Sequence, residues 1–153
     1  MQVEHRIPPN TANETQKRAL VVDDDPGVRH LLWTVLRREG WEVVLAGNVR
    51  EAEHRMQSDT FSLLITDHAM PGEDGLSFVR RIRSNAVKSL TAHRNVPVIM
   101  VSSFNDPAQL QEVDSAGVGA FVEKPFRPQT FAKVVQRLEA CHTQEFIHVG
   151  TYN

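Results

Sequence analysis

The sequence predicts a doubly wound α/β domain with five parallel strands and five helices. From Ala19 onward, short β-branched apolar runs alternate with amphipathic stretches, and the runs are too apolar for strands that expose one face. Such strands, joined by right-handed helical crossovers, form a parallel sheet that is covered on both faces. The 153 residues, of which 41% are hydrophobic, suffice for one domain with a real core.

The expected strands are the five apolar runs at residues 19–22, 43–46, 61–66, 96–101 and 119–122. Amphipathic segments between them predict helices over residues 26–39, 48–57, 75–90, 106–116 and 128–141. Asp25, Asn48, Asp74 and Asp106 stand where N-caps are expected, and Gly40 ends the first helix. We interpret Asp25 as a helix cap in preference to a metal ligand.

The chain divides into a flexible N-terminal leader over residues 1–17, a domain over residues 18–141, and a C-terminal tail over residues 142–153. The leader is polar and contains the Pro8-Pro9-Asn10 break, while the tail shows no convincing apolar period. Phe146, Ile147 and Val149 could still dock locally.

Charge and cysteine content exclude several function classes. Seventeen Lys and Arg against nineteen Asp and Glu leave a net charge of −2, which gives no bulk electrostatic attraction to nucleic acid or an anionic membrane. We therefore expect no direct nucleic-acid or membrane binding. Cys141 is the single cysteine, and no signal-peptide pattern is present, which favours a cytoplasmic location.

The residues that directly follow the strands carry the chemistry, because ligands bind outside the carboxyl ends of strands in an open α/β sheet. They are Asp23, Asp24 and Asp25 after the first strand, Asp67 after the third, Ser102 and Ser103 after the fourth, and Glu123 and Lys124 after the fifth. Carboxylates gathered at one edge repel one another unless a cation joins them, and hard oxygen ligands suit Mg²⁺. The metal, the Lys124 ammonium and the Ser102 hydroxyl would together receive a phosphoryl group.

Asp67 is the best candidate for carrying that phosphoryl group covalently. It stands alone at the end of the central strand, and a tight turn over residues 70–75 follows it and leaves its carboxylate open to a donor. Carboxylates act as nucleophiles in aspartyl-phosphate chemistry once cations neutralise the incoming oxygens.

Four motifs in order resemble the receiver domain of response regulators, the CheY-like phospho-acceptor of two-component signalling. They are VVDDDP from Val21, TDHAMPGEDG from Thr66, PVIMVSS from Pro97 and FVEKPF from Phe121, and the match spans roughly residues 18–141. The resemblance implies the flavodoxin-like strand order 2-1-3-4-5, for which the chemotaxis member of this family is a standard example.

The resemblance also implies roles for individual residues. Asp67 would accept the phosphoryl group from a phosphohistidine on a sensor histidine kinase or a phosphotransfer protein. Mg²⁺ or Mn²⁺ would be held by Asp23, Asp24, Asp67 and the backbone carbonyl of Ala69. Ser102 and Lys124 would contact the phosphoryl oxygens, Ser102 and Phe121 would be the switch residues, and Pro125 would follow a cis peptide bond.

On this basis the chain would be a signalling receiver and not an enzyme in the usual sense, because it would catalyse only its own phosphorylation and autodephosphorylation. Phosphorylation would change the face formed by the fourth helix, fifth strand and fifth helix, through which a downstream protein or a second copy would bind. A surface of Arg29, Trp33 and Arg37 on the first helix could dock the kinase, although a tryptophan resting on its neighbours explains it equally well.

Three residues at the rim of the predicted site could modulate it. Ala69 and Phe104 carry no group able to orient a hydrolytic water, which predicts slow autodephosphorylation. His68 follows Asp67 and could control access. The other histidines have no metal-binding spacing, and we expect them to be solvated.

Other functions remain as alternatives. The chain could be a receiver cut from a longer transcriptional regulator or hybrid kinase. An aspartate-nucleophile phosphohydrolase of the haloacid-dehalogenase type is a remote alternative, because Pro26 stands where those enzymes require glycine followed by threonine or valine. An FMN module is disfavoured because three aspartates in its first loop would repel the phosphate.

Overall fold

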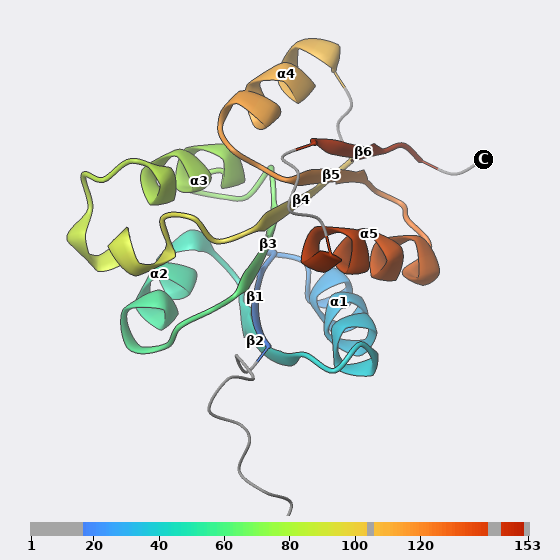
Figure 1. Ribbon diagram of the computed structural model, residues 1–153, viewed down its shortest axis with the longest axis horizontal. Coiled ribbons are helices and arrows are strands. Elements are labelled where there is room, and N and C mark those ends of the chain that lie inside the picture. Colours follow the sequence, from blue (N-terminus) through green and yellow to red (C-terminus); the bar gives the residue numbers. More distant parts are fainter. Residues whose placement is uncertain (1–16, 104–105, 141–144, 152–153) are drawn as a thin grey trace, which may run out of the picture.

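Six parallel strands form a single sheet in the order β2-β1-β3-β4-β5-β6 (Figure 1). The computed structural model describes residues 17–103, 106–140 and 145–151. The strands are β1 (Arg18–Val22), β2 (Glu42–Ala46), β3 (Leu63–Asp67), β4 (Val98–Ser102), β5 (Ala120–Glu123) and β6 (Ile147–Val149). The expected order of the first five strands is confirmed, and β6 extends the sheet beyond β5. No apolar period in the sequence indicated this last strand.

Helices cover both faces of the sheet, as the continuous burial of its central strands requires. They are α1 (Pro26–Arg38), α2 (Val49–Ser58), α3 (Gly75–Arg83), η2 (Lys88–His93), α4 (Pro107–Ser115) and α5 (Pro128–Ala140). Helices α1 and α5 pack on one face, whereas α2, α3, α4 and the 3₁₀ segment η2 contribute to the core on the other (Figure 1).

Side-chain caps fix where four of the helices begin. The carboxylate of Asp25 accepts from the backbone N–H of Gly27, and the side chains of Asn48, Asp74 and Asp106 cap α2, α3 and α4 in the same manner. These oxygens satisfy amide groups that have no partner within the helix. The interpretation of Asp25 as a cap is therefore consistent with its contacts.

The third helix is shorter than predicted. It ends at Arg83 instead of residue 90, and the backbone of Ser84 is extended at its C-cap. The apolar residue Leu90 belongs to η2, which begins after Val87 and buries Leu90 and His93. His93 was expected at the surface with the other histidines, and that expectation was wrong: its Nε2 accepts a hydrogen bond from the backbone N–H of Phe61 at 3.0 Å. This contact joins residues distant in sequence, so spacing could not reveal it.

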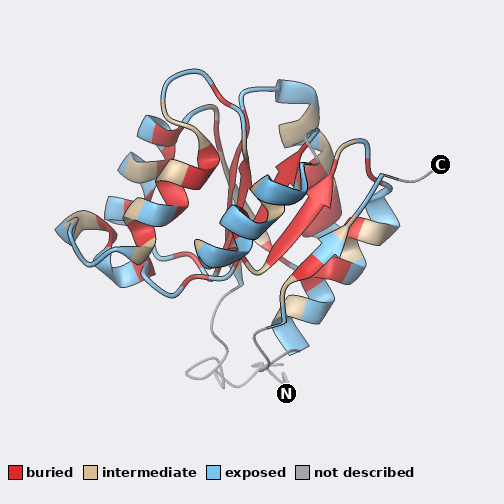
Figure 2. Cartoon of the chain, turned by 90° about the horizontal axis from the view of Figure 1, so that it is seen from above, coloured by how far each residue is buried: buried red, intermediate tan, exposed pale blue. Residues whose placement is uncertain are grey.

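Two apolar cores lie on opposite faces of the sheet. Leu20, Leu64 and Met100 face the core under α2 and α3, while Val21, Ile65 and Val101 face the core under α1 and α5. Strand residues therefore alternate between the cores, and exposed residues lie on the outer helix faces (Figure 2). None of the helices in the described part of the chain has both the length and the apolar character needed to span a membrane.

Gly75 allows α3 to begin directly against the end of β3. Its N–H donates to the carbonyl of His68 at 2.8 Å. A Cβ at this position would lie only 2.0 Å from the backbone oxygen of Asp67. Glycine is thus required here by the close approach of two backbone segments.

Replacing Gly75 with alanine should lower the free energy of unfolding by about 1–3 kcal/mol, because the backbone around Asp67 must move to admit the methyl group. Urea denaturation measures this change. Gly47→Ala is the matched control, since a Cβ there meets only the ends of the Arg29 and Glu51 side chains at 3.4 Å. Equal stability of the two variants would contradict the steric argument.

Candidate functional site

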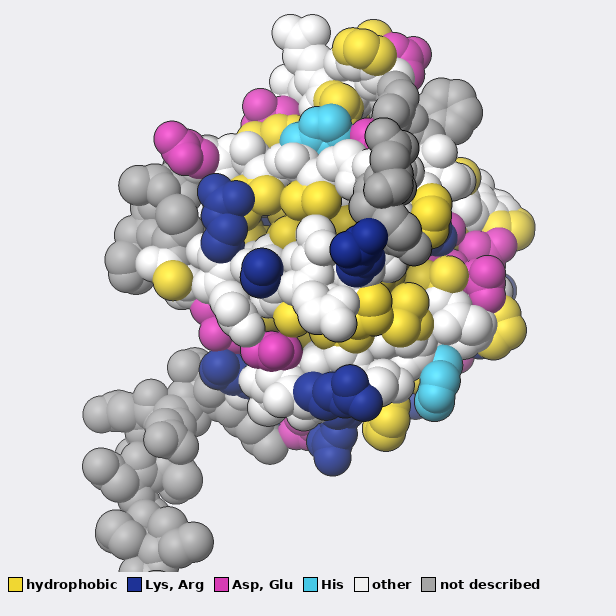
Figure 3. All heavy atoms as spheres, turned by 90° about the vertical axis from the view of Figure 1, so that its right-hand side faces the viewer, with side chains coloured by type: hydrophobic (Ala, Val, Ile, Leu, Met, Phe, Trp, Pro, Cys, Tyr) yellow, Lys and Arg dark blue, Asp and Glu magenta, His cyan; other side chains and the backbone are white. Residues whose placement is uncertain are grey.

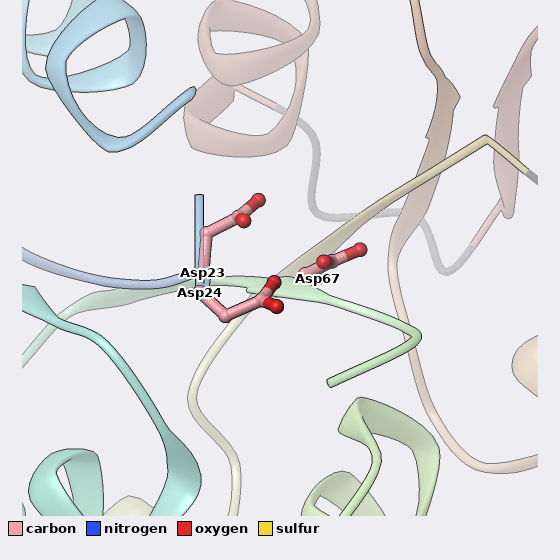
Figure 4. A group of neighbouring side chains, drawn as sticks. All are labelled: Asp23, Asp24 and Asp67. Atoms are coloured by element: carbon pink, nitrogen blue, oxygen red, sulfur yellow. The ribbon is translucent and has the colours of Figure 1, made fainter. Parts of the chain in front are cut away.

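Three carboxylates converge at the carboxyl edge of the sheet. Asp23 and Asp24 follow β1, and Asp67 is the last residue of β3; each offers an oxygen atom within 4.8 Å of the others (Figure 4). Asp23 and Asp67 are buried, while Asp24 is exposed. The spatial cluster predicted from the strand ends is therefore present, and its oxygen-only donor set suits a hard divalent cation such as Mg²⁺.

Lys124 brings a positive charge to this cluster from the end of β5. Its Nζ lies 3.0 Å from Oδ2 of Asp23 and 3.4 Å from Oδ1 of Asp67. The Lys124–Pro125 peptide bond is cis. The ammonium group therefore bridges aspartates from two different strands and offsets part of their mutual repulsion.

The backbone and side chain of Asp23 are held from several directions. Its Oδ1 accepts the N–H of Asp25 at 2.9 Å, and its backbone N–H donates to the carbonyl of Ala46 at 3.1 Å. The guanidinium Nη1 of Arg29 donates to the backbone carbonyl of Asp23 at 2.6 Å. The contacts with Ala46 and Arg29 hold the backbone of Asp23, while the N–H of Asp25 and the ammonium of Lys124 hold its carboxylate. Sequence reasoning placed Arg29 in a possible docking surface and missed this contact.

Asp67 has a perturbed acidity that reflects its surroundings. Burial raises the pKa of its carboxyl group from 3.8 to about 6, and the negative charges of Asp23 and Asp24 add to this effect, while Lys124 opposes it. The side chain of Asp67 is only 9% exposed. A carboxyl group with a raised pKa in a cluster of charges is a candidate functional group.

Ser102 lies on β4, the strand next to Asp67, and Phe121 lies on β5, one strand further along the sheet. Ser102 ends β4 opposite Glu123 of β5, and its carbonyl accepts the N–H of Lys124 at 2.8 Å. Phe121 is 1% exposed and belongs to the core on the side of α2, α3 and α4. Both residues that the sequence indicated as switch positions are thus buried, with Ser102 at the site and Phe121 in the strand beside it.

The rim of the site connects to α4 through His68. The amide nitrogen of Gln109 in α4 lies 3.2 Å from Nε2 and 3.3 Å from Nδ1 of this imidazole. Ala69 is exposed at the same rim. Phe104, the other predicted modulator, lies outside the described residues.

A groove opens beside Asp24, between the residues that follow β2 and the turn that follows β3. Asn48, Arg50, Pro71 and Glu73 are among its lining residues, together with Asp24 itself. Gly72 in that turn has a φ of +85°, which glycine adopts without strain. The groove gives the exposed edge of the acidic cluster an open approach.

The histidines do not contribute to the acidic cluster. No group of three or more potential metal ligands among the described residues contains a histidine. His148 instead lies in β6, with its Nε2 2.8 Å from Oε1 of Glu123. Sequence reasoning missed this pair because 25 residues separate its members.

Arg29, Trp33 and Arg37 of α1 were predicted to form one exposed surface, but only Trp33 and Arg37 contact each other. Trp33 is 37% exposed, stacks with His30 and lies beneath the guanidinium of Arg37 at 5.8 Å. Its contacts with neighbours match the structural interpretation of this residue, while Arg29 is engaged with Asp23.

The sequence matches the family model of the response regulator receiver domain over residues 19–136. The chain belongs to this family. Among curated relatives, this receiver is 32% identical over 127 residues to the chemotaxis protein CheY1 of Helicobacter pylori, covering 78% of this chain and 94% of CheY1. It is 30% identical over 125 residues to the CAI-1 autoinducer sensor kinase/phosphatase CqsS of Vibrio cholerae.

The match to CqsS includes 82% of this chain but only 18% of the length of CqsS. Among solved structures, CheY4 of Vibrio cholerae superposes with a TM-score of 0.72 and 31% identity, covering 81% of this chain and 99% of CheY4. A response regulator receiver protein from Pseudomonas putida gives a TM-score of 0.70 at 29% identity, with coverage of 80% and 97%. Receiver domains are signalling modules that act with histidine kinases, and an acidic triad such as Asp23, Asp24 and Asp67 is typical of their Mg²⁺ site.

Replacing Asp67 with asparagine should stabilise the receiver at neutral pH. The folded state holds a proton on Asp67 up to about pH 6, whereas the unfolded chain loses it near pH 4, so the wild-type protein loses stability as pH rises through this interval. The asparagine variant lacks this cost. Its free energy of unfolding should exceed that of the wild type by almost nothing at pH 4 and by about 2–3 kcal/mol at pH 7.

Urea denaturation in the presence of EDTA measures this difference without a bound cation. Asp114→Asn is the matched control, because Asp114 is exposed on α4 and its substitution should change the pH profile little. An Asp67→Asn variant that is less stable than the wild type at pH 7 would refute the proposed cost of ionising Asp67.

Proposed function

We propose that Asp67 is the phosphorylation site of this receiver and takes its phosphoryl group from a phosphohistidine. The observation that carries this proposal is the convergence of the Asp67 carboxylate with Asp23, Asp24 and the Lys124 ammonium at one sheet edge. Among the described residues, these three carboxylates are the group of acidic, histidine or cysteine side chains close enough to hold a cation together, and Lys124 contacts two of them.

In the transfer, an oxygen of the Asp67 carboxylate attacks the phosphorus atom as the P–N bond to the donor imidazole breaks. A new P–O bond forms in an acyl phosphate, and the electron pair of the broken bond stays with the imidazole nitrogen, which takes up a proton. Asp67 must be ionised to attack, and a bound cation would favour the ionised carboxylate over the protonated form that burial favours in the metal-free protein.

The residues present fit a divalent cation. Asp23, Asp24, Asp67 and the backbone carbonyl of Ala69 would hold Mg²⁺ or Mn²⁺, which when bound neutralises phosphoryl oxygens. Lys124, now shared between Asp23 and Asp67, would turn to an oxygen of the phosphoryl group. During this change the N–H of Asp25 would still hold the carboxylate of Asp23, and Arg29 would still hold its backbone carbonyl.

The response would spread from Ser102 and Phe121. The hydroxyl of Ser102 would donate to the new phosphoryl group, and the shift at the end of β4 would pass to Phe121 on the neighbouring strand. We infer that the α4–β5–α5 face then changes for a downstream protein or a second copy of the chain. A sensor histidine kinase or a phosphotransfer protein would supply the phosphoryl group in the cytoplasm, with the exposed Trp33 side of α1 as a candidate contact.

Incubation with acetyl phosphate and Mg²⁺ should add one phosphoryl group to the wild-type chain. Intact-mass spectrometry should find this addition dependent on Mg²⁺ and absent in Asp67→Asn, because the asparagine amide is not a nucleophile for phosphorus.

Asp25→Asn is the matched control, since Asp25 caps α1 and asparagine caps helices equally well. This variant should be labelled like the wild type. Labelling of Asp67→Asn at the wild-type rate would place the acceptor elsewhere, and no labelling of a folded, Mg²⁺-binding wild type would reject phosphorylation.

We further propose that apolar residues at the rim prolong the phosphorylated state. Ala69 carries no group that could orient a water molecule, so Ala69→Asn should shorten the half-life of the acyl phosphate several-fold. Phosphate release after removal of acetyl phosphate measures the decay. A polar replacement of Phe104 tests the second rim position in the same assay.

Ala86→Asn provides the control for Ala69→Asn, because Ala86 is an exposed alanine beyond the C-terminus of α3. Its decay should equal that of the wild type. If the acyl phosphate of Ala69→Asn also decays at the wild-type rate, the apolar side chain of Ala69 does not prolong the phosphorylated state.

A further inference from the structure

The C-terminal strand β6 occupies the edge of β5. It pairs with β5 in parallel, in the register Ala120 with Ile147, Phe121 with His148 and Val122 with Val149. The N–H of Ile147 donates to the carbonyl of Gly119 at 3.0 Å. An edge strand otherwise presents unpaired backbone groups to other chains, and here a segment of the same chain fills that position.

Both faces of this segment bury side chains. Ile147 and Val149 join the core on the side of α5, while Phe146 packs against the core that contains Phe121. In Figure 3, the side of the molecule that carries α5 and β6 shows hydrophobic side chains between Lys and Arg. Because β6 lies along β5, it covers part of the α4–β5–α5 face.

A polar contact fixes β6 at the carboxyl end of β5. Glu123 is 2% exposed, and its carboxylate receives two contacts from the C-terminal segment: His148 Nε2 lies 2.8 Å from Oε1, and the N–H of Thr151 donates to Oε2 at 3.1 Å. The imidazole of His148 also lies 6.0 Å from the ring of Phe121. A buried carboxylate depends on such partners, since leaving it without them is costly.

The same end of β5 belongs to the candidate site. Glu123 pairs with Ser102 across the sheet, and the next residue, Lys124, contacts Asp23 and Asp67. A movement of Ser102 or Lys124 toward a phosphoryl group would therefore act on the backbone that positions Glu123. The contact of Glu123 with His148 and Thr151 would be altered by that displacement.

We propose that residues 146–151 form an intramolecular ligand that covers the β5 edge in the unphosphorylated protein and is released when Asp67 is phosphorylated. This inference rests on the proposed function, and it adds that a partner using the α4–β5–α5 face must displace the chain's own C-terminal strand. Because coupling is reciprocal, weakening β6 favours the phosphorylated state.

Hydrogen exchange of the full chain tests the docking of β6 directly. His148→Ala should increase the exchange rate of the amides in residues 147–149 by tenfold or more, and Ile147→Asp should do the same by placing a charge at a buried position. His54→Ala is the matched control, because His54 is exposed on α2. In the His54→Ala variant, the amides of β6 should exchange at the wild-type rate.

Acetyl phosphate with Mg²⁺ then tests the coupling. Phosphorylated wild-type protein should lose protection in residues 147–149 to a similar extent, and both β6 variants should be phosphorylated several-fold faster than His54→Ala. Intact mass is recorded on the same samples, so the phosphorylation of Asp67 and the release of β6 are read separately.

The outcomes separate this inference from the proposed function. A labelled Asp67 with unchanged protection in β6 would overturn the release of β6 and leave the acceptor role intact. Slower phosphorylation of the two variants would overturn the inhibitory direction. Absence of labelling would reject the proposed function together with the release that rests on it, and full protection in both His148→Ala and Ile147→Asp would reject docking through these contacts.

Discussion

The gathering of negative charge at one edge of a parallel sheet is the constraint on which the rest of this molecule depends. Parallel strands end at the same edge, so Asp23, Asp24 and Asp67 meet there although 43 residues separate Asp24 from Asp67 in the chain. Their repulsion and the burial of Asp67 oppose folding, and the ammonium of Lys124 offsets part of that cost. The site is therefore held in a charged state that a cation or a phosphoryl group can change.

The five strands and the acidic cluster were predictable from local patterns in the sequence, whereas the order of these strands came from the resemblance to receiver domains. Apolar runs mark strands buried on two faces, and the residue after each run must lie at the ligand-binding edge. The positions of Asp23, Asp67 and Lys124 needed nothing beyond this rule. Helix starts were also predictable, because Asp25, Asn48, Asp74 and Asp106 cap them through contacts within a few residues.

What the sequence could not predict depends on contacts that neither apolar periodicity nor residue spacing indicates. Strand β6 has three residues, too few for a period, and it forms because the edge of β5 supplies backbone partners. The burial of His93 follows from its bond with Phe61, and the contact of Arg29 with the Asp23 carbonyl follows from the turn between β1 and α1. In each case the burial or contact of a residue depends on the partner that it meets in the fold and not on its residue type.

The direction of β6 has a consequence for anything attached to this protein. A domain of this fold that ended with α5 would leave its last residue at the edge opposite the aspartates, since helices run antiparallel to the strands. Here β6 runs parallel to β5, and the chain departs from Val149 toward the edge that carries Asp67. A fluorescent label or fused domain attached after this strand would thus sit near the acidic cluster and could report on, or obstruct, the approach of a large phosphoryl donor.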